Sequence, residues 1–135
     1  MSTSPETIHH RRRGAPVDCH VLHFGESESW LEQCLASLED EPLNVVIVRG
    51  GFPGNIGAAR AHAIGLGSAP YWAFVDADDW MEAGIVVRCT TILDERPDLV
   101  GVYTDYHAVT PDGIPTYRTR KHPWSPLALL GSCWE

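Results

Sequence analysis

The sequence predicts an α/β fold built on a mostly parallel β-sheet. Short apolar segments typical of buried strands alternate with segments whose apolar residues recur at helical spacing. The order is strand, helix, strand, helix, strand, helix, strand, and crossovers of this kind connect parallel neighbours. Two unusual loops, one rich in glycine and one rich in aspartate, each follow a predicted strand. We therefore expect both loops at the carboxyl edge of the sheet, where proteins of this class bind ligands.

The first predicted strand and helix lie within residues 17–38. Residues 17–24 are mostly apolar or aromatic, which predicts a buried strand. Residues 27–38 predict a helix, and Ser29 with Glu32 fits a capping box at its start. The apolar face of this helix is formed by Leu31, Cys34, Leu35 and Leu38.

Two further strand and helix pairs follow. Residues 43–48 are rich in Val and Ile and predict a strand, and the Ala-rich residues 56–66 predict a helix. Residues 71–75 predict a third strand. Residues 81–95 predict an amphipathic helix that ends before Pro97, because proline cannot continue a helix.

The last part of the chain predicts a fourth strand and a hairpin. Residues 99–109 are predicted as the strand, residues 111–113 (Pro-Asp-Gly) as a turn, and residues 114–120 as the returning strand. Residues 123–135 carry five large apolar side chains that we expect to cover apolar surface, within the chain or by forming a homo-oligomer: Trp124, Leu127, Leu129, Leu130 and Trp134.

Length and charge limit the class of protein. The 135 residues fit one domain, which we place at residues 15–135 after a flexible polar tail over residues 1–14. The three consecutive arginines of that tail, Arg11 to Arg13, can contact phosphate, but the pattern favours a solvated tail. The net charge of −8 argues against general nucleic-acid binding.

Apolar runs and cysteines bear on the cellular compartment. No apolar run approaches the roughly 18–20 residues of a transmembrane helix, and the polar start lacks the apolar stretch of a secretory signal. The four cysteines are widely spaced and form no Cys-x-x-Cys pair. We therefore expect a cytoplasmic protein with reduced thiols and no transmembrane segment.

The aspartate-rich loop is the strongest candidate for chemistry. Asp76, Asp78 and Asp79 fall within four residues directly after a predicted strand, and such a cluster is costly without a cation. Mg²⁺ and Mn²⁺ prefer carboxylate oxygens and leave positions open for phosphate. For Asp79 the pattern favours a helix cap with Glu82. Capping uses one carboxylate, so Asp76 and Asp78 are the candidate metal or ligand residues.

The glycine-rich loop at residues 50–57 joins a strand to a helix. Glycines let a backbone approach a ligand, and a helix N-terminus favours phosphate. The loop is neither a Walker A loop nor a clean Gly-x-Gly-x-x-Gly, so an ordinary tight turn is equally consistent with it. Arg60 follows one turn into the helix, where it either reaches a diphosphate or lies on the surface. No pair of Ser and His, or of Cys and His, has a spacing that indicates nucleophilic catalysis.

Two motifs resemble a known family. The segments NIGAAR at residues 55–60 and GSAPYWAFVDADDW at residues 67–80 resemble the central signature of family 2 glycosyltransferases. The layout of residues 17–48 is similar to the first part of that family, so the resemblance covers roughly residues 17–112.

The resemblance implies a three-layer α/β/α fold of the nucleotide-diphospho-sugar transferase type (GT-A, Rossmann-like). It implies a nucleotide-diphospho-sugar donor, Mn²⁺ or Mg²⁺ held by Asp76 and Asp78, and transfer of the sugar to an unknown glycan, lipid or protein acceptor. Donor-binding residues implied by position are Phe24, Gly25, Arg49, Gly50, Asn55, Gly57, Arg60, Asp76 and Ala77. The resemblance assigns no catalytic residue.

The sequence departs from the family pattern at three places. The first strand of the family usually ends in a Pro-Thr-Tyr/Phe-Asn-like turn, whereas this chain has Leu22-His23-Phe24-Gly25. The second strand of the family usually ends in Asp-Asp-Gly-Ser, with an aspartate that reads the base, whereas this chain has Arg49-Gly50-Gly51-Phe52. The residues after the fourth strand are too few for the usual acceptor-binding half, so we expect a partner or the substrate to complete that site. The alternative hypothesis is a degenerate, non-catalytic binding or scaffold protein. A dinucleotide-binding domain is a weaker alternative, because the glycine fingerprint is not clean.

Overall fold

The structure, a computed structural model, describes residues 4–119, and these belong to two compact units. The first unit is Met1–Leu99 and the second is Val100–Glu135. The division differs from the single domain that the sequence predicted over residues 15–135. The predicted role of residues 123–135 in covering apolar surface lies outside the described residues.

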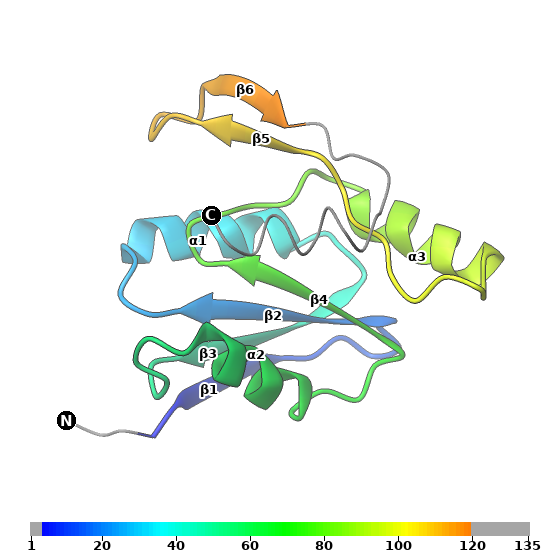
Figure 1. The fold of residues 1–135 in the computed structure, drawn as a ribbon, viewed down its shortest axis with the longest axis horizontal. Coiled ribbons are helices and arrows are strands. Elements are labelled where there is room, and N and C mark those ends of the chain that lie inside the picture. The colour runs from blue at the N-terminus through cyan, green and yellow to red at the C-terminus, as the bar shows by residue number, and fades with distance from the viewer. Residues whose placement is uncertain (1–3, 120–135) are drawn as a thin grey trace, which may run out of the picture. The chain divides into compact units, whose positions relative to one another are not determined.

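The first unit contains a four-stranded, mostly parallel sheet in the order β1-β3-β2-β4 (Figure 1). The central strand β2 (Val17–His23) pairs in parallel with β3 (Leu43–Arg49) on one side and with β4 (Tyr71–Asp76) on the other. All seven residues of β2 are buried, because helices cover both faces of the sheet. The three predicted strands at residues 17–24, 43–48 and 71–75 are thus confirmed.

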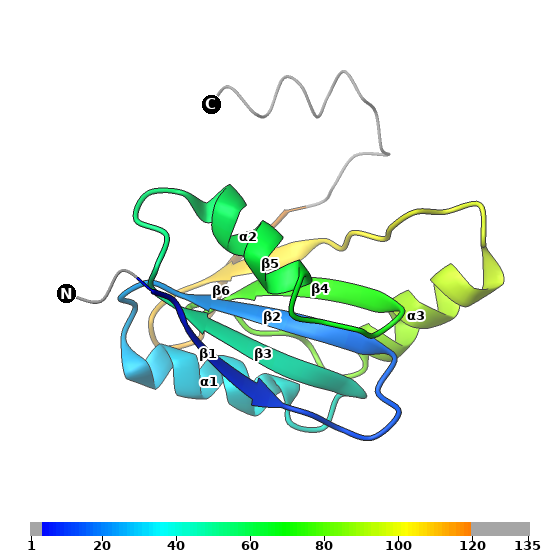
Figure 2. The ribbon, with the colours of Figure 1, turned by 90° about the horizontal axis from the view of Figure 1, so that it is seen from below.

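Three helices cover the two faces of this sheet (Figure 2). Helices α1 (Glu28–Leu38) and α3 (Ile85–Glu95) pack on one face, and α2 (Ile56–Ile64) packs on the other. The α1 face of the sheet is lined by alternate strand residues such as Cys19 and Val21, and the α2 face by others such as Leu22. Because successive side chains of a strand point to opposite faces of the sheet, the two faces carry separate hydrophobic cores.

Strand β1 (Glu6–His10) lies within the range for which the sequence predicted a flexible tail. It runs antiparallel to β3 along the edge of the sheet, with Ile8 opposite Ile47. Most of its side chains are polar and none is buried, so hydrophobic periodicity does not reveal it. The pairing of its backbone with β3 creates the strand, and the expectation of a flexible segment does not hold for these residues.

The predicted cap of the first helix is absent, and the third helix starts later than predicted. Helix α1 begins after Ser27 without a side-chain cap bond, so the Ser29–Glu32 capping box is wrong. Helix α3 begins at Ile85 rather than Met81, because Gly84 adopts a left-handed conformation (φ 77°) that helical geometry excludes.

The second unit contains a β-hairpin of β5 (Tyr106–Val109) and β6 (Pro115–Thr119). The predicted turn is confirmed: Gly113 has a φ of 79°, and its N–H donates to the Thr110 carbonyl at 2.8 Å. Within the described residues, β5 pairs only with β6 and does not join the four-stranded sheet. The predicted fourth parallel strand over residues 99–109 is therefore wrong. An antiparallel partner lies only a turn away, and a short hairpin closes with little loop entropy.

Two sequence predictions concern cysteines and membrane spans. Cys19, Cys34 and Cys89 are free thiols, and Cys133 lies outside the described residues. Among residues 4–119, no helix combines the length and the apolar character needed to cross a membrane.

Candidate functional site

The candidate site lies where three parallel strands end, at the carboxyl edge of the sheet. In the register of the sheet His23 pairs with Arg49, and Leu22 pairs with Asp76, so β2, β3 and β4 end almost level. The glycine-rich loop leaves β3 and the aspartate loop leaves β4, one on each side of β2. The backbone N–H of Gly50 donates to the His23 carbonyl at 3.2 Å, which ties the first loop to the end of β2.

The aspartate loop is a tight turn that follows β4. Ala77 N–H donates to the Leu22 carbonyl at 3.1 Å, and Asp79 N–H donates to the Asp76 carbonyl at 2.9 Å. Ala77 is buried in the core, whereas Asp78 and Asp79 are exposed. The three carboxylates therefore lie close together in one loop at the edge of the sheet.

Asp79 does not cap the following helix, contrary to the sequence prediction. Its place is taken by Glu41, a buried residue of the loop between α1 and β3. The Glu41 carboxylate accepts hydrogen bonds from the N–H groups of Gly84 and Val86, the latter at 3.2 Å. Because Glu41 satisfies the first turn of α3, Asp79 is not needed for capping, and all three aspartates are available to a ligand.

Arg60 of α2 lies beside Asp76 at this edge. The Arg60 Nη2 atom is 3.7 Å from Asp76 Oδ1, and the guanidinium lies over the Phe74 ring, 5.4 Å from its centroid. Strand alternation brings the pair together: Val75 and Ala77 face the core on the α1 side, so Phe74 and Asp76 face α2. The Arg60 Nε atom is buried and has no hydrogen-bond partner within residues 4–119.

The arrangement leaves part of the guanidinium unused. Both side chains of the ion pair are more than 40% exposed, so solvent screens their attraction and the pair contributes little to stability. Arg60 is thus held at the edge by its ring contact and its carboxylate partner, with donors left for an incoming group.

Electrostatic crowding in the aspartate loop shifts two pKa values. Partial desolvation of its carboxylate by the surrounding loop, together with the charges of Asp78 and Asp76, raises the pKa of Asp79 above its ordinary value. Beneath the loop, Cys34 donates its S–H to the Asp76 carbonyl at 3.7 Å. Burial and the three aspartate charges raise the pKa of the Cys34 thiol to about 12, so this cysteine stays protonated at neutral pH and does not act as a nucleophile.

The donor set suits a cation that arrives with phosphate groups. Among the described residues, no group of three or more His, Cys, Asp or Glu side chains is placed to hold a metal by itself. Mg²⁺ is commonly held by one or two carboxylates plus substrate phosphates and water. Asp76 and Asp78 match this pattern, whereas a dedicated protein cage does not fit the residues present.

The glycine-rich loop is shaped partly by local geometry. Gly50 and Gly51 have φ values of 63° and 81°, which favour glycine. A Cβ atom on Gly51 would overlap the backbone of Pro5, 2.6 Å from its nitrogen, so this glycine is required by the approach of the chain before β1. The need for glycine at position 51 is therefore explained without a ligand, which agrees with the ordinary tight turn that the sequence left as an alternative.

Helix α2 starts at this loop and points its N-terminus toward the edge. Asn55 is its N-cap, and the Asn55 Oδ1 atom accepts a hydrogen bond from Ala58 N–H at 3.0 Å. Gly57 lies exposed in the first turn, and that turn contains no acidic residue. The positive end of the helix dipole is thus not neutralised by a side chain of its own first turn.

The end of β3 carries an ion pair that the sequence did not reveal. Arg49 donates to both carboxylate oxygens of Glu28, at 3.3 and 3.1 Å. Glu28 is the first residue of α1, twenty-one positions earlier, and its side chain is 64% exposed. A carboxylate therefore reaches the end of β3 from another element, although the chain has Arg49 where the family pattern has aspartate.

The end of β2 exposes an aromatic ring. Phe24 is 39% exposed, and its N–H donates to Glu26 Oε2 at 2.6 Å. Gly25 has a φ of 119°, so glycine permits this sharp exit from the strand. The buried His23 Nε2 donates to the Glu26 carbonyl at 2.9 Å. These contacts hold the turn and leave the Phe24 ring facing solvent.

Sequence reasoning missed Glu28 and Phe74 at this edge, and it missed Glu41, which caps α3 from the loop before β3. Strand parity alone points to Phe74, because it lies two residues before Asp76. No local pattern indicates the other two, since their partners are 21 or more positions away. No protein-family model, curated protein or solved structure matches the chain. The resemblance to family 2 glycosyltransferases therefore rests on the motifs at residues 55–60 and 67–80.

Proposed function

We propose that the carboxyl edge of the first unit binds a nucleotide-diphospho-sugar together with Mg²⁺ or Mn²⁺, and that the protein transfers the sugar to a glycan, lipid or protein acceptor. The observation that carries the proposal is the meeting of Arg60 with Asp76 at the end of β4, directly beside Asp78 and Asp79. A guanidinium and a carboxylate cluster at one sheet edge provide the two kinds of charge that a metal-bound diphosphate needs.

The cation is assigned to Asp76 and Asp78. Both carboxylates belong to the same turn, and the crowding that raises the pKa of Asp79 favours a positive ion beside them. When bound, the cation neutralises charge on the leaving diphosphate. The contribution of the protein is to hold two carboxylates in the hydrogen-bonded turn at the end of β4, so that little reorganisation is required on binding.

The diphosphate is assigned to Arg60 and the first turn of α2. A helix N-terminus binds phosphate through its free N–H groups and its dipole. Gly57 in that turn is exposed and has no side chain to obstruct a ligand. The guanidinium of Arg60 lies over Phe74 and beside Asp76, and its side chain is 42% exposed, so its remaining donors can reach a phosphate.

The nucleoside is assigned to the ends of β2 and β3. The exposed ring of Phe24 offers a surface on which a base can stack, and Gly25 and Gly50 leave the strand ends uncrowded. Glu28 supplies a carboxylate next to Arg49. We assign Glu28 the hydrogen-bonding role toward the base or ribose that the family pattern gives to an aspartate of the second strand.

A non-catalytic binding or scaffold function is the second candidate. It is favoured by the bidentate pairing of Arg49 with Glu28, which occupies the carboxylate and places a cation where the family pattern has an acid. This candidate predicts binding at the same edge without sugar transfer.

Calorimetry with UDP, GDP, CDP and dTDP in the presence of Mn²⁺ tests the site. We expect one diphosphate to bind, binding to weaken at least about tenfold in Asp78→Asn, and binding to persist in Asp40→Asn, an exposed acid at the other end of α1. If none of the four binds, the site proposal fails. A panel of nucleotide-sugars then separates the two functions. If no donor is transferred or hydrolysed, only the binding function remains.

A further inference from the structure

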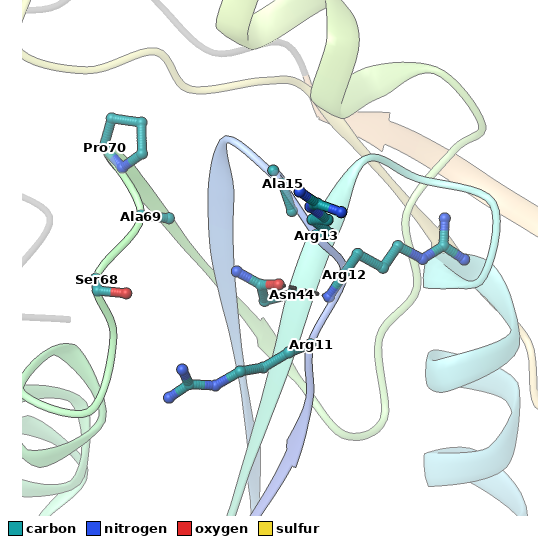
Figure 3. A pocket seen from close by; sticks show the side chains of 9 residues that line it. Arg11, Arg12, Arg13, Ala15, Asn44, Ser68, Ala69 and Pro70 are labelled. Atoms are coloured by element: carbon teal, nitrogen blue, oxygen red, sulfur yellow. Dashed lines mark hydrogen bonds between the residues drawn. The ribbon is translucent and has the colours of Figure 1, made fainter.

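A hollow of about 500 Å³ lies at the amino edge of the same sheet, away from the aspartate loop. We call it the amino-edge hollow; it is lined by Arg11, Arg12, Arg13, Gly14, Ala15, Asn44, Ser68, Ala69 and Pro70 (Figure 3). Asn44 is the second residue of β3, and Pro70 directly precedes β4. The seven residues of β2 separate the two edges by roughly 20 Å at about 3.3 Å per residue. The hollow is therefore independent of the proposed donor site.

The lining is strongly positive, although the protein as a whole is negative. Three of the ten lysine and arginine residues of the protein line the hollow, and none of the eighteen aspartate and glutamate residues of the protein is among the lining residues. The buried carboxylate of Asp18 lies behind this lining and accepts three hydrogen bonds from it, from Asn44 Nδ2 and from the N–H groups of Ser68 and Ala69, at 2.6–2.7 Å. Its single negative charge offsets only part of the three positive charges of the arginines.

The turn that carries the arginines is held in place. Arg12 N–H donates to Asn44 Oδ1 at 2.8 Å, and Arg12 Nη1 donates to the Glu41 carbonyl at 3.2 Å. Gly14 closes the turn with a φ of 75°. In Figure 3 the Arg11 side chain extends toward the wall formed by Ser68, whereas the Arg12 side chain extends to the opposite side. Anchoring by Arg12 therefore positions the turn before any ligand binds.

Arg11 and Arg13 keep their donors available. Both are exposed, and within residues 4–119 neither guanidinium makes a hydrogen bond or an ion pair. A guanidinium presents five N–H donors in a planar fork that matches phosphate oxygens. A volume of about 500 Å³ lies within the usual range of small-molecule sites.

We propose that the amino-edge hollow binds a compact polyphosphate anion, of the pyrophosphate or triphosphate class, without a divalent cation. Arg11 and Arg13 bind its oxygens, and Ser68 and Asn44 form the polar wall. The alternative role of the arginines is to compensate the carbonyl ends of α1 and α2, since both helices run from the carboxyl edge to this edge. That role requires no ligand.

Titration calorimetry with sodium tripolyphosphate, in EDTA and 150 mM KCl, tests the proposal. We expect one-to-one binding that weakens about tenfold in Arg11→Gln and in Arg13→Gln, since each variant loses one charge-assisted contact. Arg88→Gln is the matched control, because Arg88 is an exposed arginine of α3 that does not line the hollow, and the affinity of this variant should stay within about twofold of wild type. Arg60→Gln should bind tripolyphosphate like wild type, which separates this site from the carboxyl edge, where Arg60 is the proposed phosphate-binding side chain.

Three results would overturn the proposal. Wild type that binds no tripolyphosphate, while Arg11→Gln and Arg13→Gln unfold at lower temperature, would assign the arginines to the helix ends. An equal loss of tripolyphosphate affinity in Arg88→Gln would indicate that the anion is attracted to any exposed positive charge rather than to the hollow. Tighter binding of a 20-base-pair DNA duplex than of tripolyphosphate, lost in the same two variants, would assign the turn to a nucleic-acid backbone.

Discussion

Replacing Asp18 tests how the chain before β4 is held to the sheet. Asp18 lies on β2, is 5% exposed and receives hydrogen bonds from Asn44 on β3 and from two consecutive N–H groups, those of Ser68 and Ala69. Gly67 is packed so closely against it that a Cβ atom there would overlap the carboxylate. One carboxylate thus joins two strands and the loop that follows α2.

The expected loss can be worked from these three bonds. A net contribution of about 1–1.5 kcal/mol for each bond gives about 3–4.5 kcal/mol for Asp18→Ala. A small domain is stable by about 5–15 kcal/mol, so the variant should lose a large part of its stability. Asp18→Asn keeps the shape but turns one acceptor into a donor, so it should lose about 1–2 kcal/mol. Gly67→Ala should also destabilise, because the three bonds leave the Asp18 side chain no freedom to move aside.

The loss should depend on pH in a defined direction. Burial opposes the charge of Asp18, but the hydrogen bonds from Ala69, Asn44 and Ser68 outweigh it, so the pKa of Asp18 lies below its ordinary value. A lowered carboxyl pKa stabilises the folded state above the unfolded value of about 3.9, and this stabilisation is lost as the pH falls through the folded value. The difference between wild type and Asp18→Asn should therefore be constant from pH 5 to 8 and shrink below about pH 4.

Urea unfolding followed by tryptophan fluorescence at pH 7 and at pH 3 measures these differences. Asp40→Asn is the control for loss of one carboxylate, since Asp40 is exposed and should change the free energy of unfolding by less than about 0.5 kcal/mol. The reasoning is refuted if Asp18→Ala unfolds within about 1 kcal/mol of wild type at pH 7, or if the Asp18→Asn difference persists unchanged at pH 3.

Two further predictions concern the loops around the candidate site. Glu41→Gln should lower the free energy of unfolding by about 1–2 kcal/mol, because the amide cannot accept from both N–H groups at the start of α3. Glu39→Gln is the control, since Glu39 is an exposed neighbour whose replacement should change the free energy little. Equal effects of the two substitutions in urea unfolding would contradict the capping role. Asp79→Asn should stabilise the metal-free protein by about 0.5 kcal/mol at pH 7. The raised pKa of Asp79, caused by partial desolvation and by Asp78 and Asp76, means that wild type loses stability as the pH rises from about 4 through that raised value. A pH series of unfolding midpoints for wild type and Asp79→Asn checks this pH dependence, and parallel profiles for the two proteins would contradict it.

The edge at which the candidate site lies could be predicted from local pattern. Two loops that each follow an apolar strand must emerge at the same edge of a parallel sheet, and the structure places Arg60 3.7 Å from Asp76 there. The partners of the individual side chains could not be predicted in the same way. The sequence suggested that Asp79 caps the next helix, because it precedes Glu82 at the right spacing, and that inference considered only neighbours along the chain.

Local pattern was enough to define β2, β3, β4 and the helices between them, because a buried strand or an amphipathic helix leaves its period, and an Ala-rich helix its composition, in consecutive residues. Long-range contacts carry no such pattern. Strand β1 exists because its backbone pairs with β3, α3 is capped by Glu41 from a loop 43 positions away, and Glu28 reaches Arg49 across the sheet edge. The hairpin of β5 and β6 pairs with itself rather than extending the parallel sheet within the described residues. These outcomes depend on which backbone groups and charges meet in space, and only the folded path of the chain brings them together.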